Sequence, residues 1–465
     1  MGKMIRTLLG WGFLSFLLAM SGCSTRHAAD SPGGIGWPVE EPQVDLTQYR
    51  DVQSRPGQNA AVAVCVAISG GGHRAANFAA GVFLGLENCG PANHPYNLLK
   101  EVDYFSTVSG GGFAAGAYVS SLLDYQENGG QAQDFRFGEA LAGTGPRGMV
   151  NPRVKRDLEV GYHNWLARGV FAIKALGNLD RGDFLERALD DKVLGRSYAE
   201  RRGKRSLVMG EMFIPVDAAS DRQVRLPLWI PNSTVYENGA VFPFTPDILS
   251  QYGITGCTHR LGELQFDGAG SSAARYAAFP LSVGMKSSAA FPGAIPATTL
   301  KSSRDPRNPY LHLFDGGMSD NLGILTAIRI LSAQPTNTVK KKLLIVVDAY
   351  PGTHEPFSKT SGSPRIRQIL TRSTGISLDS SHQRLGDMLR RMGESEGIRV
   401  VVIGFASLLK RPGEFDQLFA TVRGVRTTLN VSLEVQNLLV QAGREAVMAS
   451  QDSLNAAIQD LMGVH

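Results

Sequence analysis

Three short glycine-rich segments carry residues whose types and spacing point to nucleophilic chemistry. In one of them, an apolar stretch at residues 102–108 is followed by Ser109, by glycines, and then by a run of small residues. This pattern predicts a strand, a tight turn and a helix, with the serine hydroxyl exposed at the turn. The glycines allow the strand and the helix to pack closely, where a Cβ would collide. A serine held in this way can attack an acyl carbon and form a covalent acyl-enzyme.

A glycine loop at residues 70–72 is the second segment. It lies between an apolar run at 61–68, which predicts a strand buried on both faces, and an alanine-rich stretch that predicts a helix. Such a loop presents backbone N–H groups to an anion, either a phosphate or the oxyanion of acyl transfer. The nucleotide-binding patterns Gly-Lys-Ser/Thr and G-x-G-x-x-G are lacking, so nucleotide binding is not supported. Arg74 adds positive charge at the loop, and we expect no role for His73.

The third segment places an acid at the end of a predicted strand that begins at Tyr310. Asp315 is followed by two glycines, and a carboxylate beside such a turn is held in place rather than solvated. A serine nucleophile needs a base. No histidine occupies a comparable turn, and His312 packs within the strand, so we assign Asp315 as the base. Asp320 is the competing acid, and we interpret it as a cap or turn residue.

Together, these three segments resemble the patatin-like phospholipase family, and the glycine loop is similar to that of the cytosolic phospholipases of the same superfamily. The resemblance covers about residues 60–332 and includes 287–293, 315–321 and, more loosely, Asn232-Ser-Thr. It implies a Ser-Asp dyad without histidine. The residues that it assigns are Ser109 as nucleophile, Asp315 as base, Gly70, Gly71 and Gly72 as oxyanion donors, and Arg74 as the residue that holds the loop. Thr107 stands where the usual Gly-x-Ser-x-Gly pattern has glycine, which affects the expected shape of the turn.

Residues 1–22 resemble a bacterial lipoprotein signal. Two cations precede an apolar stretch at 8–20, which is too short to span a bilayer, and small residues precede Cys23. The resemblance implies that Cys23 is lipidated and ties the chain to a membrane, and Ser24 favours the outer membrane of the cell envelope. An ordinary secretory signal is the alternative. Residues 23–59 are rich in proline, glycine and polar side chains and are interpreted as a linker.

Composition excludes several other classes. The 465 residues are 43% hydrophobic and 19% charged, which suits a large globular core. The formal net charge of +5 is too small to indicate a nucleic-acid partner. The four cysteines match no zinc or disulfide spacing, and no metal, organic cofactor or calcium requirement is implied.

The order of elements predicts the fold class. Apolar strands alternating with helices favour a three-layer α/β domain with a largely parallel central sheet and helices on both faces, as in the patatin-like fold. We expect a catalytic domain at 60–332, and C-terminal strands and a helix at 333–465 that pack on it, with the site at strand ends beside Ser109. Other expected elements are strands at 206–213, 224–230, 241–244, 340–348 and 399–404, a turn over 231–234 and 236–239, helices at 180–194, 282–294 and 433–461, and a flexible lid at 351–381.

The sequence therefore predicts a serine acyl hydrolase that cleaves ester bonds of phospholipids or other lipids. Two alternatives remain open. A Ser-His-Asp esterase would need a base histidine after the acid, for which His354 and His382 are the candidates. A non-catalytic lipid-binding lipoprotein of the same fold finds its support in Thr107.

Overall fold

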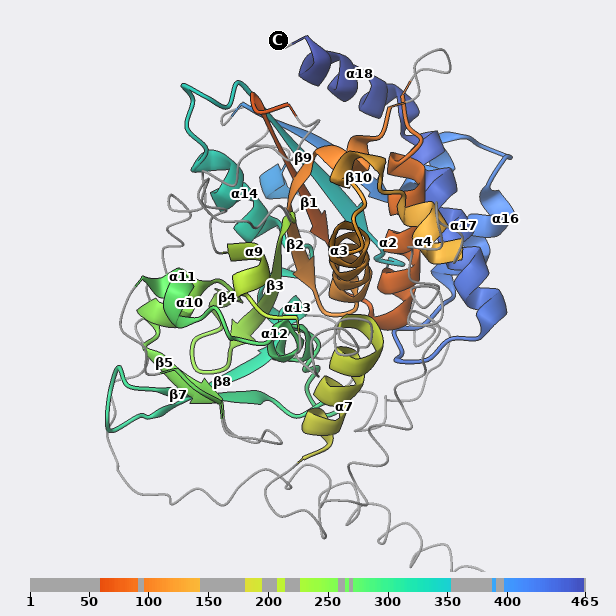
Figure 1. Cartoon of the computed structure of the whole chain (residues 1–465). Helices are drawn as coiled ribbons and strands as arrows, with labels where there is room; N and C mark the ends of the chain where they lie inside the picture. Colours follow the sequence, from red (N-terminus) through yellow and green to blue (C-terminus); the bar gives the residue numbers. More distant parts are fainter. Residues whose placement is uncertain are drawn as a thin grey trace, which may run out of the picture.

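A mixed β-sheet runs through the molecule, with helices on both of its faces (Figure 1). This computed structural model describes residues 59–90, 96–142, 180–194, 207–213, 226–257, 264–266, 271–352, 387–389 and 397–463. From one edge to the other, the strands are β10 (Ile398–Gly404), β9 (Lys341–Asp348), β1 (Val62–Ile68), β2 (Val102–Val108), β3 (Leu228–Val235), β8 (Tyr310–Asp315), β7 (Thr298–Ser302), β5 (Ile254–Cys257) and β6 (Leu264–Gln265), and β4 (Val241–Pro243) pairs with β3.

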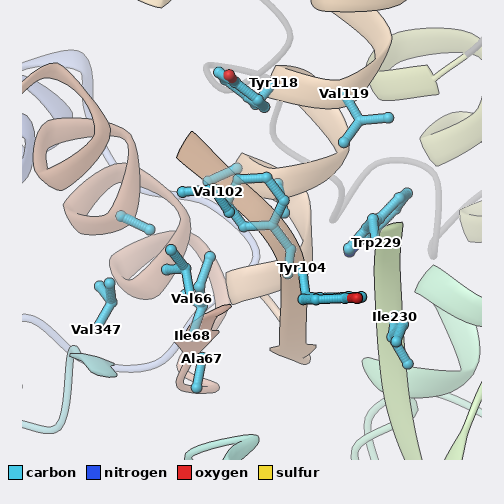
Figure 2. Close-up of a cluster of buried hydrophobic side chains, with 14 of the residues drawn as sticks. Val66, Ala67, Ile68, Val102, Tyr104, Tyr118, Val119, Trp229, Ile230 and Val347 are labelled. Carbon is cyan, nitrogen blue, oxygen red and sulfur yellow. The ribbon is translucent and has the colours of Figure 1, made fainter. Parts of the chain in front are cut away.

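The strands from β10 to β3 form the parallel half of the sheet. All seven residues of β1 are buried, as the continuous apolar run predicts for a strand covered on both faces. Its side chains belong to one buried hydrophobic cluster, which also contains Val347 of β9, Tyr104 of β2 and, further along the chain, Tyr118 (Figure 2). Strand β9 pairs directly with β1, so residues beyond 332 complete the sheet that carries the candidate site.

The strands beyond β3 form an antiparallel half, in which β8, β7, β5 and β6 follow one another. Short connections such as residues 303–309, between β7 and β8, permit antiparallel pairing, whereas parallel neighbours need a long crossover. The predicted α/β class with helices on both faces is confirmed. The central strands are mostly parallel, as expected, and the antiparallel strands beyond β3 make the sheet mixed as a whole.

Helices α3 (Gly111–Glu127) and α14 (Ile324–Ser332) cover opposite faces of the sheet. The Ser106 hydroxyl donates to the carbonyl of Gly323 at the start of α14, over 2.6 Å. The next residue, Thr107, lies against Gly112 of α3. Because successive residues of a strand point to opposite faces, the two helices lie on different sides of β2, as Figure 1 also shows.

Helix α2 (Gly72–Leu86) packs against α17 (Leu433–Ala449) with almost no space between their backbones. A Cβ built on Gly81 would lie 2.0 Å from the carbonyl oxygen of Val440, and one on Gly443 would lie 2.2 Å from that of Phe78. Glycine is required at both positions, because any side chain would force the helices apart. Helix α17 thereby holds α2, whose first residue, Gly72, belongs to the glycine loop.

Several predicted boundaries change. Residues 210–213 form helix α9 (Gly210–Phe213), not a strand, and β3 continues through 231–234, where a turn was expected. The helix expected at 282–294 is α12 (Leu281–Ser288), which ends earlier. The helix expected at 433–461 divides at Ser450 into α17 and α18 (Gln451–Met462). The expected lid lies almost wholly outside the described residues.

The turn at Tyr236 to Gly239 and the strands near 241–244, 340–348 and 399–404 lie where they were predicted. The segment 180–194 forms helix α7 and a short π-helix. The remaining helices are α4 (Phe137–Ala142), α7 (Arg181–Leu189), the π-helix η5 (Asp190–Leu194), α10 (Pro246–Gln251), α11 (Ser272–Arg275), α13 (Gly317–Asp320) and α16 (Asp416–Arg423), with 3₁₀ turns η2 (Leu98–Glu101), η3 (Ala132–Asp134) and η7 (Phe405–Lys410).

Candidate active site

Ser109 lies in the turn between β2, which ends at Val108, and α3, which begins at Gly111. Its φ angle is +50°, and among the described residues it is the one non-glycine residue with a positive φ. This left-handed conformation costs a side-chain-bearing residue about 1–2 kcal/mol. Hydrogen bonds hold the turn: the Ser109 amide donates to the Ser288 hydroxyl over 2.9 Å, and the Ser109 carbonyl accepts from the amide of Gly112 over 3.0 Å.

Asp315, the last residue of β8, faces this serine. The Ser109 hydroxyl donates to Oδ2 of Asp315 over 2.8 Å, and Oδ1 of the same carboxylate accepts from the amide of Gly317, also over 2.8 Å. Burial raises the pKa of Asp315 to about 6, and the hydrogen bonds from Gly317 and Ser109 offset only part of that effect. A carboxylate with this pKa is ionised at neutral pH and close enough to accept the serine proton.

Strand β3 brings the two residues together because it lies between the strands that carry them. Val108 pairs with Asn232 on one side of β3, and Asp315 pairs with Ser233 on the other. Because Asn232 and Ser233 are adjacent in β3, the end of β2 and the end of β8 lie at the same position along the sheet. Ser109 and Asp315 are therefore in contact, although they lie 206 positions apart in the chain.

The glycine loop lies directly against the serine turn. A Cβ built on Gly70 would be 3.3 Å from Cβ of Ser109 and 2.6 Å from Oδ1 of Asn321. Gly71 and Gly72 have φ angles of +145° and +58°, and Gly72 is the first residue of α2. A Cβ built on Gly110 would lie 2.1 Å from the carbonyl oxygen of Gly72, so the N-terminus of α2 lies beside the serine turn.

The Gly70 amide corrects one expectation. It donates to the carbonyl oxygen of Asn321 over 3.0 Å, so it is not a free oxyanion donor in this structure. Within the described residues, no acceptor takes the amides of Gly71 and Gly72. The amides of Gly71 and Gly72 are therefore the donors of the loop that remain free to bind an anion. Gly70, which has no side chain, allows the loop backbone to lie close to Ser109.

Arg74 is buried behind the loop and holds it to other parts of the chain. Its Nε donates to the carbonyl of Ala349 over 3.0 Å, and a terminal guanidinium nitrogen donates to that of Val425 over 2.9 Å. Burial lowers the pKa of Arg74 to about 10, and the nearby Asp348 acts in the opposite direction. The neighbouring His73 packs edge-on to Phe113, with ring centroids 6.0 Å apart, on the core side of the helix.

Thr107 fits the turn without distorting it. Its side chain is buried and accepts a hydrogen bond from the indole nitrogen of Trp229 over 2.9 Å. The space comes from α3, where a Cβ on Gly112 would lie 3.2 Å from the threonine hydroxyl and one on Gly116 would lie 2.9 Å from the indole ring. The glycines of the helix thus accommodate the residue that departs from the usual pattern.

A polar network behind the site was not predicted from the sequence. The Asn232 side chain donates to the Ser106 hydroxyl over 3.0 Å and to the carbonyl of Thr107 over 3.1 Å, and accepts from Thr326 over 2.6 Å. The Ser288 hydroxyl donates to the carbonyl of Asn232 over 2.6 Å. Asn232 and the segment containing Ser288 are noticeable in the sequence only through the family resemblance.

Two other polar residues considered in the sequence have hydrogen-bond partners other than Ser109. Asp320 accepts backbone hydrogen bonds from Leu322, Gly323 and Leu325, which confirms it as a turn acid. His312 lies within β8, as expected, and contacts Thr299 on the neighbouring strand over 3.0 Å.

His354, His382 and Cys23 lie outside the described residues. In the part of the chain that the structure describes, no helix combines the length and the apolar character that crossing a bilayer requires.

A family model and several solved structures are similar to this chain. A family model described as patatin-like phospholipase matches residues 66–328, more than half of the chain. Human GIVD cytosolic phospholipase A2 is a similar solved structure, with 13% identity and a TM-score of 0.43 over 86% of this chain and 60% of that one. VipD from Legionella pneumophila has 11% identity and a TM-score of 0.30, over 92% and 72% of the two chains. The chain thus spans 60% of the length of the cytosolic phospholipase that it matches. No curated protein sequence matches it.

Proposed function

Because the chain belongs to the patatin-like phospholipase family of lipid acyl hydrolases, we propose that it cleaves ester bonds of phospholipids or other lipids with Ser109 as nucleophile and Asp315 as base. The observation that carries the proposal is the 2.8 Å hydrogen bond from the serine hydroxyl to the carboxylate. A nucleophile and its base need this separation for proton transfer.

The reaction would proceed in two steps. Asp315 takes the proton of Ser109 as its Oγ attacks the ester carbonyl carbon, and the negative charge moves to the carbonyl oxygen. Collapse of this intermediate breaks the ester bond, and the proton passes from Asp315 to the departing alcohol. Asp315 then removes a proton from water, which attacks the acyl carbon; the bond to the Ser109 Oγ breaks, Asp315 returns the proton to that oxygen, and the fatty acid leaves.

The amides of Gly71 and Gly72 would stabilise the oxyanion in both steps. They begin helix α2 beside the serine, and the positive end of a helix favours a negative charge. One donor of this kind contributes about 3–4 kcal/mol to transition-state stabilisation. Arg74 supports them indirectly, through the backbone carbonyls that it binds.

A fluorophosphonate probe and a phospholipid in mixed micelles test the proposal. We expect the probe to label Ser109, and we expect fatty acid release that disappears in Ser109→Ala. Absence of Ser109-dependent hydrolysis at a lipid interface would refute the enzyme hypothesis. Labelling of Ser109 would exclude the non-catalytic lipid-binding alternative, and a protein that neither labels nor turns over any lipid ester would support it.

The Ser-His-Asp alternative makes a different prediction for His354 and His382. In our proposal the carboxylate already occupies the position of the base, so His354→Ala and His382→Ala should retain activity within about threefold. Loss of activity by about a hundredfold in either variant, which is typical of losing a general base, would favour the triad instead.

We further propose that Cys23 is lipidated and that the mature chain is a lipoprotein of the cell envelope, at the outer membrane. The support is the sequence pattern alone: a short apolar stretch and small residues before the cysteine. Labelling of the wild-type chain by radioactive palmitate in a bacterial host, and its loss in Cys23→Ala, tests the modification. Fractionation of the two membranes tests the location.

A further inference from the structure

The end of helix α12 contacts both members of the Ser109–Asp315 pair. The Ser288 hydroxyl accepts the amide of Ser109 over 2.9 Å, and the Ser288 carbonyl accepts the amide of Gly316 over 3.2 Å. The Ala290 carbonyl accepts the amide of Asp315 over 3.0 Å. We propose that Ser288 is a positioning residue that sets the geometry of this pair; the inference rests on the proposed function.

The orientation of the Ser288 hydroxyl is fixed. A hydroxyl has one proton to donate, and Ser288 donates it to the carbonyl of Asn232 over 2.6 Å. The oxygen lone pairs therefore remain for the amide of Ser109. Asn232 is itself held by Ser106 and Thr326 in the buried network, so the acceptor is anchored to the core rather than to solvent.

This bond acts at the strained residue. Ser109 is held at a φ of +50°, which an L-residue seldom adopts unless its surroundings enforce it. Without an acceptor at Ser288, the Ser109 amide loses its partner, and the turn can relax towards a commoner conformation. The Oγ of Ser109 would then leave the 2.8 Å position against Asp315 on which proton transfer depends.

The chain offers a matched control one residue away. Ser287 is as deeply buried as Ser288, on the same helix, but its hydroxyl has no hydrogen-bond partner in the described structure. Ser287→Ala removes the same atom as Ser288→Ala without touching Ser109.

The experiment follows fluorophosphonate labelling in time on full-length protein. The final amplitude reports the fraction of folded sites, and the rate constant reports the reactivity of each site. For Ser288→Ala we expect an amplitude near that of the wild type, a rate constant at least tenfold lower, and an equal fall in kcat with KM within twofold. For Ser287→Ala we expect a rate constant within twofold of the wild type.

A second variant keeps the inference testable if Ser288→Ala does not fold. Ser288→Cys fills the volume with a poor hydrogen-bond acceptor, and we expect it to show the same loss of rate at retained amplitude. A wild-type rate constant in either folded variant, or an equal loss in Ser287→Ala, would overturn the inference. A wild-type protein that neither labels nor turns over would instead overturn the proposed function.

Discussion

Gly110 lies so close to Gly72 that a Cβ built on Gly110 would be 2.1 Å from the carbonyl oxygen of Gly72. The turn after Ser109 and the start of α2 are therefore in backbone contact, and one cannot shift without the other. This contact joins two of the three glycine-rich segments, and the hydrogen bond between Ser109 and Asp315 joins the third.

Gly110→Ala should therefore disturb both segments at once. The added Cβ meets backbone, which cannot rotate away, so we expect kcat/KM to fall by about a hundredfold or more as the proposed oxyanion donors, the amides of Gly71 and Gly72, move. Gly112→Ala is the milder comparison, because its Cβ would meet side-chain atoms rather than backbone: the Thr107 hydroxyl at 3.2 Å and the Trp229 ring at 3.6 Å. Steady-state kinetics with a soluble ester check both. Equal losses in the two variants would argue against the contact as the cause.

Asp315→Asn should abolish most activity while preserving the fold. The amide oxygen can still accept from the amide of Gly317, but the side chain can no longer take the Ser109 proton. A general base contributes about 10²- to 10⁴-fold to rate, so we expect a fall of that size in kcat.

Asp320→Asn is the matched control, and it should affect stability rather than activity. The variant loses a carboxylate oxygen that accepts a backbone amide in the turn, so Tm should fall while the labelling rate constant of folded sites stays unchanged.

Activity should rise with pH along a limb centred near pH 6, because burial raises the pKa of Asp315 to about 6 and only the ionised carboxylate is a base. The measurement is kcat/KM against pH with an uncharged ester. The limb should be absent in Asp315→Asn and present in Asp320→Asn, although burial also raises the pKa of Asp320 to about 6.

Stability should change with pH in the opposite sense. Asp315 holds its proton more tightly in the folded chain than at its ordinary pKa of 3.8, so the folded state is favoured at low pH. This contribution to the free energy of unfolding is lost as the pH rises from 3.8 through 6. Denaturant unfolding across this range should show a shallower decline in Asp315→Asn than in the wild type.

Arg74→Lys should weaken the support of the glycine loop. The guanidinium donates from two nitrogens to carbonyl oxygens on separate segments, those of Ala349 and Val425. The single ammonium nitrogen of lysine cannot reproduce both contacts. A hydrogen bond to a charged group contributes about 1.5–3 kcal/mol, so unfolding by denaturant should show a loss of that order. Unchanged stability would show that the loop is held mainly by its other contacts.

The sequence was sufficient to predict the three glycine-rich segments and the strands that precede them. Those predictions depend on local rules: an apolar run forms a buried strand, and a residue followed by glycines sits in a tight turn. Strands β1, β2 and β8 and the helices after the first two lie where these rules place them. The rules failed at β3, because the polar segment Pro231 to Thr234, typical of a turn, is buried between two neighbouring strands.

The sequence by itself determined which residues could act as nucleophile and base, because type and turn position are local properties. Only the tertiary structure decided three contacts. The Ser109 hydroxyl donates to Asp315, the Gly70 amide donates to the carbonyl of Asn321, and the Ser109 amide donates to the Ser288 hydroxyl. Each of these contacts joins residues far apart in the chain. Their formation depends on strand register and helix packing, which no local pattern encodes.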